Sequence, residues 1–171
     1  MTTCENGACG SRRGLASVMA GILAGFAVLL LLWQFVRSNA PTAAPPMFEG
    51  APVTLRDAAE RAGEGGIVFA YATADWCGPC QHYKKTALSD PRVTEWVKAN
   101  ATPAYIDVDR NATDAQTLGA SAIPMTVILN GRGEVLASAT GAMSADRLLS
   151  MLDEAKRRHS PDRAAAPGGE R

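Results

Sequence analysis

Two cysteines separated by two residues are the part of this sequence best suited to chemistry. They lie in the run Trp76-Cys77-Gly78-Pro79-Cys80. A cysteine thiolate is a nucleophile and also a metal ligand, and two thiols at this spacing can close into a disulfide. The pattern therefore indicates either thiol–disulfide exchange or one half of a tetrahedral zinc site.

A zinc site would need two more ligands. The chain has only two histidines, His82 and His159, and one further cysteine pair, Cys4 and Cys9. That second pair precedes a long uncharged segment that we expect to separate it from Cys77, so metal-free exchange is favoured. For Cys4 and Cys9 we expect a reduced, mobile tail, with a metal or redox-sensing site as the alternative.

Disulfide exchange requires a thiolate, and a helix N-terminus can supply one. The residues after Cys80 continue as a predicted helix, which places Cys77 at its start, where unpaired amides and the helix dipole favour negative charge. In Cys-X-X-Cys sites the thiol pKa falls from ~8.5 to roughly 3.5–7.5. Cys80 follows on the same helix face, so we predict that Cys77 attacks and Cys80 resolves the mixed disulfide.

Pro79 lacks an amide proton, which limits the donors near the thiolate. The expected redox group is the Cys77–Cys80 disulfide itself, with no other cofactor and no metal.

The elements that must position this pair alternate along the chain. Hydrophobic runs predict strands at 67–71, 103–108, 125–129 and 134–137, and amphipathic or capped segments predict helices between and after them. Thr54, Asp90 followed by Pro91, and Ser144 are the predicted helix caps. Asn130-Gly131 predicts a hairpin. The order α-β-α-α-β-α-β-β-α indicates an α/β domain, a mixed central sheet flanked by helices on both faces.

These motifs together resemble the thioredoxin family. The run from Trp76 to Cys80 matches that family's active site, and Ala122-Ile123-Pro124-Met125-Thr126 resembles the segment that carries its cis-proline. The closing hairpin and Gly141-Ala142 also match. The resemblance implies a thioredoxin fold over residues 52–158, with Trp76, Gly78 and Pro79 in the active-site loop and with Ile123 and Pro124 binding the substrate.

A second likeness is to the C-terminal periplasmic domain of the disulfide reductase DsbD. It is carried by Ala74-Asp75-Trp76-Cys77 and by Leu88-Ser89-Asp90-Pro91-Arg92-Val93. DsbD-type domains usually lack Gly-Pro between the cysteines, and this chain lacks the multi-helix electron-transfer domain. The likeness implies disulfide-containing exported proteins as partners and a membrane electron donor of DsbD type.

Two positions depart from the thioredoxin pattern. Tyr71 stands where the family usually has a buried aspartate, and Tyr105 stands where a lysine is common. The resemblance therefore leaves the route of proton transfer open. Asp75 is a candidate proton carrier, with an ordinary exposed loop acid as the alternative. His82 is expected to be a solvated helix residue.

An uncharged segment near the N-terminus predicts a membrane anchor. Residues 14–36 contain no charged side chain, and 23 residues exceed the ~20 needed to cross the hydrocarbon core. The alternative is a cleaved signal peptide, whose apolar region is usually about 7–15 residues long. Arg12 and Arg13 before the segment favour a cytoplasmic N-terminus. We therefore expect a single-pass inner-membrane protein whose main domain is periplasmic.

The remaining composition completes the predicted organisation. The formal net charge is zero, which gives no reason to expect a nucleic-acid partner. We predict a cytoplasmic tail at 1–13, the transmembrane anchor at 14–36, an Ala/Pro-rich linker at 37–51, the domain at 52–158 and a disordered tail at 159–171.

The sequence leaves three functional hypotheses. The first is a reductase of disulfides in exported proteins, because Gly-Pro spacing resembles reducing family members. The second is the same chemistry in the oxidase or isomerase direction. The third is a thioredoxin-fold interaction or assembly module with dispensable cysteines. The direction depends on a potential, where about 30 mV changes the equilibrium tenfold, so sequence leaves it open.

Overall fold

The computed structural model describes residues 11–38, 42–52 and 54–159, and the chain separates into one unit at 1–40 and another at 41–171. The first unit contains helix α1, Ser11–Ser38, which includes the predicted helical segment 14–36. Within the described residues, none of the helices combines the length and the apolar character required to cross a membrane. Residues 1–10, with Cys4 and Cys9, and residues 160–171 of the predicted C-terminal tail lie outside the described residues.

The second unit contains the elements that the sequence predicts, in the predicted order. Short 3₁₀ helices, η1 (Pro46–Phe48) and η2 (Ala87–Ser89), are additional. The main elements are α2 (Leu55–Ala62), β1 (Ile67–Thr73), α3 (Gly78–Lys85), α4 (Pro91–Asn100), β2 (Thr102–Asp107), α5 (Ala112–Thr117), β3 (Met125–Asn130), β4 (Val135–Thr140) and α6 (Ala145–His159).

The local signals that predict these boundaries are all used in the structure. The Thr54 hydroxyl accepts a hydrogen bond from the Asp57 amide at the start of α2, and the Asp90 carboxylate caps α4. Ser144 accepts from the Arg147 amide. In the hairpin between β3 and β4, Gly133 has a φ of 82°, a conformation that glycine adopts without a Cβ penalty.

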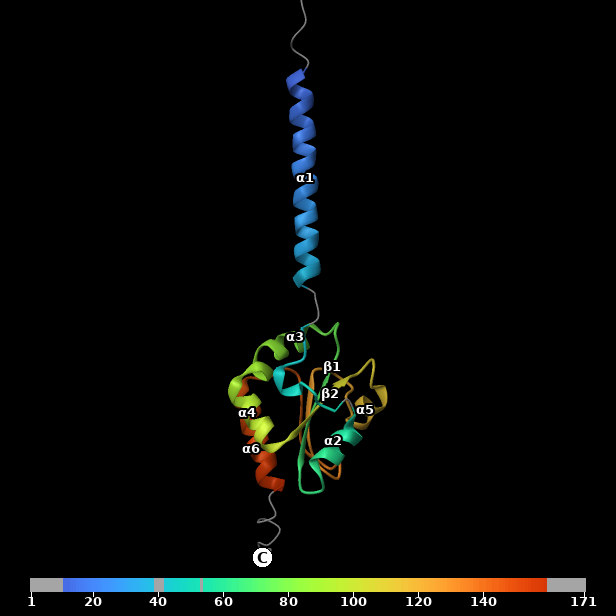
Figure 1. The fold of residues 1–171 in the computed structure, drawn as a ribbon, viewed down its shortest axis with the longest axis vertical. Helices are drawn as coiled ribbons and strands as arrows, with labels where there is room; N and C mark the ends of the chain where they lie inside the picture. The colour runs from blue at the N-terminus through green and yellow to red at the C-terminus, as the bar shows by residue number, and fades with distance from the viewer. Residues whose placement is uncertain (1–10, 39–41, 53, 160–171) are drawn as a thin grey trace, which may run out of the picture. The chain divides into compact units, whose positions relative to one another are not determined.

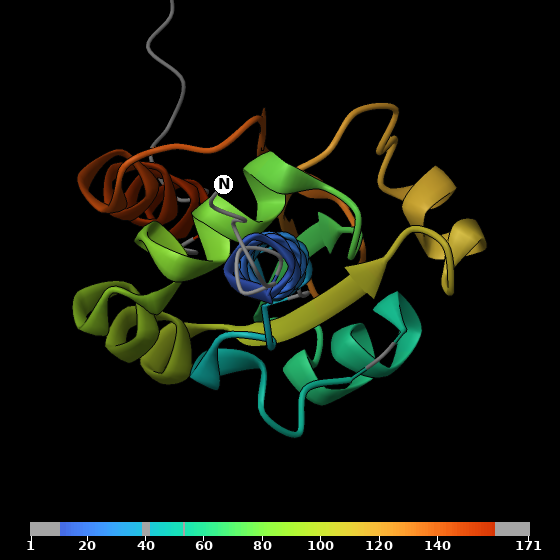
Figure 2. The same cartoon turned by 90° about the horizontal axis from the view of Figure 1, so that it is seen from above.

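The four strands form one mixed sheet in the order β2-β1-β3-β4. β1 pairs with β2 in parallel and with β3 in antiparallel orientation, and β3 pairs with β4 in antiparallel orientation. Helices α2 and α5 cover one face, and α4 and α6 cover the other (Figures 1 and 2). The predicted mixed sheet with helices on both faces is confirmed.

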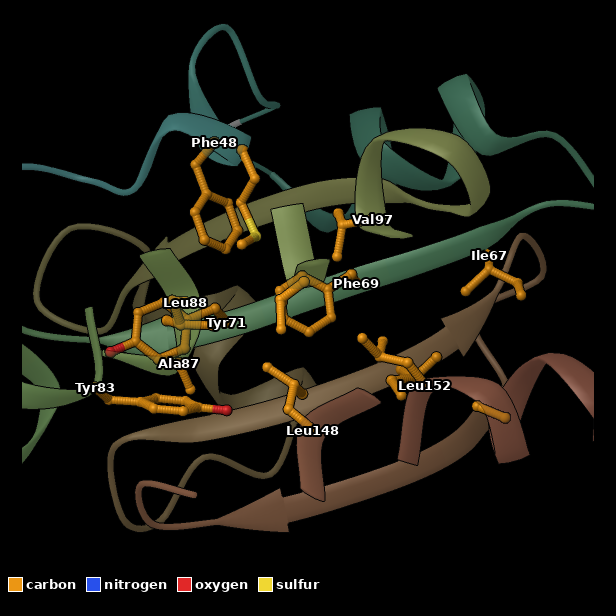
Figure 3. Packing of buried hydrophobic residues seen from close by; sticks show 14 residues of the cluster. Phe48, Ile67, Phe69, Tyr71, Tyr83, Ala87, Leu88, Val97, Leu148 and Leu152 are labelled. Atoms are coloured by element: carbon orange, nitrogen blue, oxygen red, sulfur yellow. The ribbon is translucent and has the colours of Figure 1, made fainter. Parts of the chain in front are cut away.

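Side chains alternate along β1 and divide the core in two. Phe69 and Tyr71 point to the face covered by α4 and α6, while Val68, Ala70 and Ala72 point to the opposite face. All seven residues of β1 are buried, as expected for a central strand covered on both sides. Figure 3 shows the first of these faces, where the aromatic rings pack against aliphatic side chains from α4 and α6.

The segment before α2 belongs to this core, which differs from the predicted linker at 37–51. Met47 and Phe48 are 3% and 5% exposed, and the Phe48 ring lies 6.0 Å from that of Phe69 and 5.4 Å from that of Tyr105. The Ala/Pro-rich composition predicts an extended spacer, but two large apolar residues within it stabilise a packed conformation. The packed domain therefore begins before the predicted boundary at residue 52.

Candidate redox site

The two cysteines lie at the junction between β1 and α3, as the sequence predicts. Cys77 is the N-cap residue of α3 and Cys80 lies in its first turn, and their sulfurs are joined in a disulfide of 2.00 Å. The Cys80 amide donates to the Cys77 sulfur over 3.2 Å. This donor, together with the helix dipole, is the arrangement that stabilises a thiolate at Cys77 when the disulfide is reduced.

The surroundings of the two sulfurs differ. Cys80 is completely buried, whereas Cys77 keeps 4% of its surface. Gly78 and Pro79, between them, are exposed at the first turn of α3. Cys77 is thus the slightly more accessible residue of the pair, and the roles of attacking and resolving cysteine stay a prediction.

The predicted proline loop lies beside the cysteine pair. The Ile123–Pro124 peptide bond is cis, as the resemblance implies. The Ile123 side chain packs against the cluster formed by Ala74, Cys77 and Cys80. The Pro124 carbonyl accepts a hydrogen bond of 2.7 Å from the Gly141 amide, which fixes this loop to the end of β4.

Trp76 provides an exposed aromatic surface next to Cys77. It is 71% exposed, and its indole nitrogen donates to the Asp109 carboxylate over 2.8 Å. Asp109 follows β2, so this bond joins the active-site loop to the neighbouring strand. No local spacing in the sequence links Asp109 to Trp76, so the sequence alone does not predict this contact.

Asp75, the candidate proton carrier, contacts Arg110 and Gln81. Its carboxylate forms an ion pair of 3.3 Å with Arg110, and its carbonyl oxygen accepts from the Gln81 side chain over 3.0 Å. Arg110 also lies 3.6 Å from the buried carboxylate of Asp107. These contacts give Asp75 a place in the charged loop beside the site, and its role in proton transfer stays a prediction. His82 is exposed, as expected.

A cluster of aromatic side chains lies next to Cys80. It includes the two tyrosines, Tyr71 and Tyr105, that depart from the thioredoxin pattern. Tyr71 is completely buried, and its hydroxyl donates to the Cys80 carbonyl over 3.3 Å. Its ring meets those of Tyr83 and Tyr105 edge-on at 5.8 and 5.9 Å. Burial raises the pKa of Tyr71 above its ordinary range, and burial also raises the pKa of Tyr83. Tyr71 is therefore a neutral hydrogen-bond donor at physiological pH.

The described residues contain no group of three or more His, Cys, Asp or Glu side chains placed to hold a metal ion. The disulfide lies at the N-terminus of α3, with the exposed Trp76 directly before it and Ile123 of the cis-proline loop packed against it.

A sequence profile of the Thioredoxin-like domain family matches residues 55–156, more than half of the chain. The chain belongs to the thioredoxin-like family. A thioredoxin from Allochromatium vinosum is 32% identical to it over 80 residues, which cover 47% of this chain and 71% of that thioredoxin. These matches place the Cys77–Cys80 disulfide in a thioredoxin-like redox domain.

Solved structures of thioredoxins are similar to this thioredoxin-like chain. The solution structure of a thioredoxin from Thermus thermophilus superposes with a TM-score of 0.57 at 19% identity, covering 69% of this chain and 95% of that one, and shows the shared fold. A mutant thioredoxin from Halobacterium salinarum is 28% identical, with a TM-score of 0.49 and coverage of 66% of this chain and 93% of that one.

Proposed function

We propose that this protein is a thiol–disulfide oxidoreductase in which Cys77 attacks and Cys80 resolves. The observation that carries the proposal is the bonded sulfur pair at the N-terminus of α3, with the more accessible sulfur beside the cis-proline loop. A Cys-X-X-Cys pair in this position lowers the pKa of its first thiol. The matches to thioredoxins support the same chemistry.

The reaction exchanges one disulfide for another. The Cys77 thiolate attacks a sulfur of the substrate disulfide, so that a Cys77–substrate bond forms, the substrate disulfide breaks, and the released substrate thiolate takes a proton. Cys80 then loses its proton and attacks the Cys77 sulfur, which forms the Cys77–Cys80 disulfide and releases the second substrate thiol. Two electrons pass from the cysteine pair to the substrate disulfide. Cys80 supplies one of the two protons, and solvent, which took up the proton of Cys77 when its thiolate formed, supplies the other.

Trp76, Ile123 and Pro124 are proposed to hold the substrate. Trp76 offers a flat exposed ring on one side of Cys77, and Ile123 packs against the cysteines on the cis-proline side. The backbone beside a cis-proline can pair with an extended peptide segment by β-type hydrogen bonds. These three residues line the approach to the attacking sulfur.

The proposed physiological direction is reduction of disulfides in exported proteins. It is supported by the Gly-Pro spacing, and the donor that would return two electrons to the Cys77–Cys80 disulfide is a membrane carrier of DsbD type. The reduction potential of the protein in glutathione buffers tests this direction. A potential near −270 mV, as in thioredoxin, is expected, whereas a value near −120 mV would place the protein among oxidants of the DsbA kind.

Residues 14–36 are proposed to anchor the protein in the inner membrane with its redox domain in the periplasm. The support is the uncharged 23-residue segment and the arginines before it. Labelling of intact cells tests the topology: an outer-membrane-permeant but inner-membrane-impermeant maleimide should reach Cys77 in the reduced protein and not Cys4. Recovery of a shortened soluble protein would instead support a cleaved signal peptide.

Insulin reduction tests the central activity. Cys77→Ser should abolish turnover, and Cys80→Ser should accumulate mixed disulfides with the substrate. The matched control is the pair Cys4→Ser and Cys9→Ser, which should reduce insulin at the wild-type rate. If a protein lacking both Cys77 and Cys80 still supports growth of a deletion strain, the interaction-module hypothesis replaces this one.

A further inference from the structure

The stretch of chain before the family domain contacts the active-site helix. We name residues 42–48 the strap. Both backbone groups of Thr42 are bound by side chains of α3: its amide donates to the Gln81 side-chain oxygen over 2.7 Å, and its carbonyl accepts from the Lys84 ammonium over 3.3 Å. The strap thus meets α3 one and four residues after Cys80.

Gln81 connects the strap to the loop that carries the attacking cysteine. Its side-chain nitrogen donates to the carbonyls of Ala74 and Asp75 over 3.2 and 3.0 Å. The Ala74 carbonyl also accepts from the Cys77 amide over 3.3 Å. Because Thr42 occupies the amide oxygen of Gln81, the nitrogen is oriented toward the loop.

The other end of the strap is held in the core. Pro45, Met47 and Phe48 are buried, and Phe48 lies 6.0 Å from Tyr71, whose hydroxyl binds the Cys80 carbonyl. The Lys84 side chain is 1% exposed, and its ammonium lies 5.2 Å from the centre of the Tyr105 ring. A buried cation satisfied by a carbonyl and an aromatic face has few alternative positions, which favours one conformation of the strap.

We infer that the strap is part of the redox site and that Gln81 is a positioning residue through which the strap fixes the backbone before Cys77. The strap precedes the region matched by the family profile, which begins at residue 55. The inference rests on the proposed attack by Cys77, since positioning matters only if that sulfur reacts. When Gln81 is held, the loop keeps the Cys77 sulfur near the Cys80 amide and the N-terminus of α3.

Loss of these hydrogen bonds should weaken the stabilisation of the Cys77 thiolate. Gln81→Met keeps the length of the side chain and its preference for a helix, but it removes all three bonds. We expect the pH midpoint of Cys77 alkylation to rise, with about three- to tenfold less thiolate below the midpoint, the effect of losing one or two hydrogen bonds. Thr42→Pro removes only the strap donor, and we expect an effect of about two- to threefold.

The experiment measures Cys77 alkylation against pH in the full-length reduced protein, with peptide mapping to separate Cys77 from the other cysteines. Ala43→Pro is the matched control, because it stiffens the same exposed stretch and leaves the Thr42 amide in place. The double variant of Gln81→Met and Thr42→Pro should have the same pH midpoint as Gln81→Met alone, because both substitutions interrupt the same series of hydrogen bonds. Thermal unfolding of each variant checks that it is folded at the assay temperature.

Three results would overturn the inference or its basis in different ways. A shift in Gln81→Met with none in Thr42→Pro would remove the strap from the site. Wild-type midpoints in both variants would remove Gln81 as well. A wild-type protein whose Cys77 titrates like a free thiol would instead overturn the proposed function, and the variants would then have nothing to position. If Thr42→Pro is unfolded, Lys84→Met, which removes the donor to the Thr42 carbonyl, takes its place with the same expected direction.

Discussion

The two faces of the sheet are built from different kinds of side chain. The face toward α4 and α6 carries large aromatic residues, some of which have a hydroxyl group, and the face toward α2 and α5 carries small or aliphatic ones. The first set includes Phe48, Phe69, Tyr71 and Tyr83. The second set includes Ala58, Val68, Ala70, Ala72, Ala104 and Ile106.

This difference separates the part of the core that makes a polar contact with the cysteine helix from a part that meets the cysteines only through the apolar side chains of Ile123 and Val108. The aromatic face extends beneath α3, where the Tyr71 hydroxyl meets the Cys80 carbonyl and the Tyr83 hydroxyl lies 3.4 Å from that of Thr126. The small side chains of the other face allow helices to approach the sheet closely but offer no polar group to the site. Changes on the aromatic face should therefore alter both stability and redox behaviour, and changes on the other face at positions other than Ile123 and Val108 should alter stability alone.

The largest expected effect is the loss of a ring from the aromatic face. Phe69→Ala should lower the free energy of unfolding by about 3–5 kcal/mol, and Ile106→Ala on the opposite face by about 2–5 kcal/mol. Urea unfolding measures both. Because Phe69 contacts the strap residue Phe48, only Phe69→Ala should also raise the pH midpoint of Cys77 alkylation. An equal shift in Ile106→Ala would show that the two faces do not differ in this way.

Overfilling the opposite face should cost less and leave the chemistry unchanged. Ala72→Leu adds three carbon atoms to a completely buried position, which should lower the free energy of unfolding by about 1–3 kcal/mol. The reduction potential in glutathione buffers should stay at the wild-type value. A changed potential with a native unfolding transition would connect this face to the site and contradict the comparison.

A single hydroxyl on the aromatic face should have a smaller effect on stability. Tyr71→Phe keeps the ring contacts with Tyr83 and Tyr105 and removes the bond to the Cys80 carbonyl, which should cost about 0.5–1.5 kcal/mol. The rate at which Cys80 resolves a mixed disulfide, followed in a single turnover, should also fall. Tyr105→Phe is the matched control, because the ring packing is kept and no hydroxyl bond to Cys80 is lost. Equal rates in both variants would show that the Tyr71 hydroxyl does not position Cys80.

At neutral pH these tyrosines are protonated in both the folded and the unfolded chain, so their ionisation does not change the free energy of unfolding. At alkaline pH it should lower that free energy. The pKa values of Tyr71 and Tyr83 are raised in the folded state, so the folded protein binds protons more tightly than the unfolded chain. The free energy of unfolding keeps its full value below about pH 10, the pKa of tyrosine in the unfolded chain, and should fall as the pH rises above it. Unfolding midpoints in urea between pH 8 and 11 measure this decline. Tyr71→Phe should decline less steeply than wild type, and an identical slope would contradict the assignment.

Local patterns in the sequence predict most of the fold and the centre of the site. The Cys-X-X-Cys spacing, the Asp90-Pro91 helix start and the Asn130-Gly131 hairpin each depend on neighbouring residues, and the structure contains all three. Strand ends differ by one to three residues, as with β1, which continues to Thr73. Interactions between residues that are close in the sequence are therefore sufficient to predict these features.

The parts that were not predicted depend on residues distant in the chain. Thr42 and Gln81 are 39 positions apart, and Trp76 and Asp109 are 33 apart, so no spacing rule connects them. The Ala/Pro-rich composition around the strap favours an extended spacer, and tertiary packing of Met47 and Phe48 overrides that local preference. The aromatic group at Tyr71 and Tyr105 was visible only as a departure from the family, whereas its contacts required the structure.

The pH dependence of alkylation in the reduced full-length protein distinguishes an activated Cys77 from an ordinary thiol, because only the thiolate reacts. Cys77 should react first, with a midpoint between about 3.5 and 7.5, while buried Cys80 reacts slowly at every pH in that range. Two cysteines that alkylate at similar rates, both with midpoints near ~8.5, would contradict it.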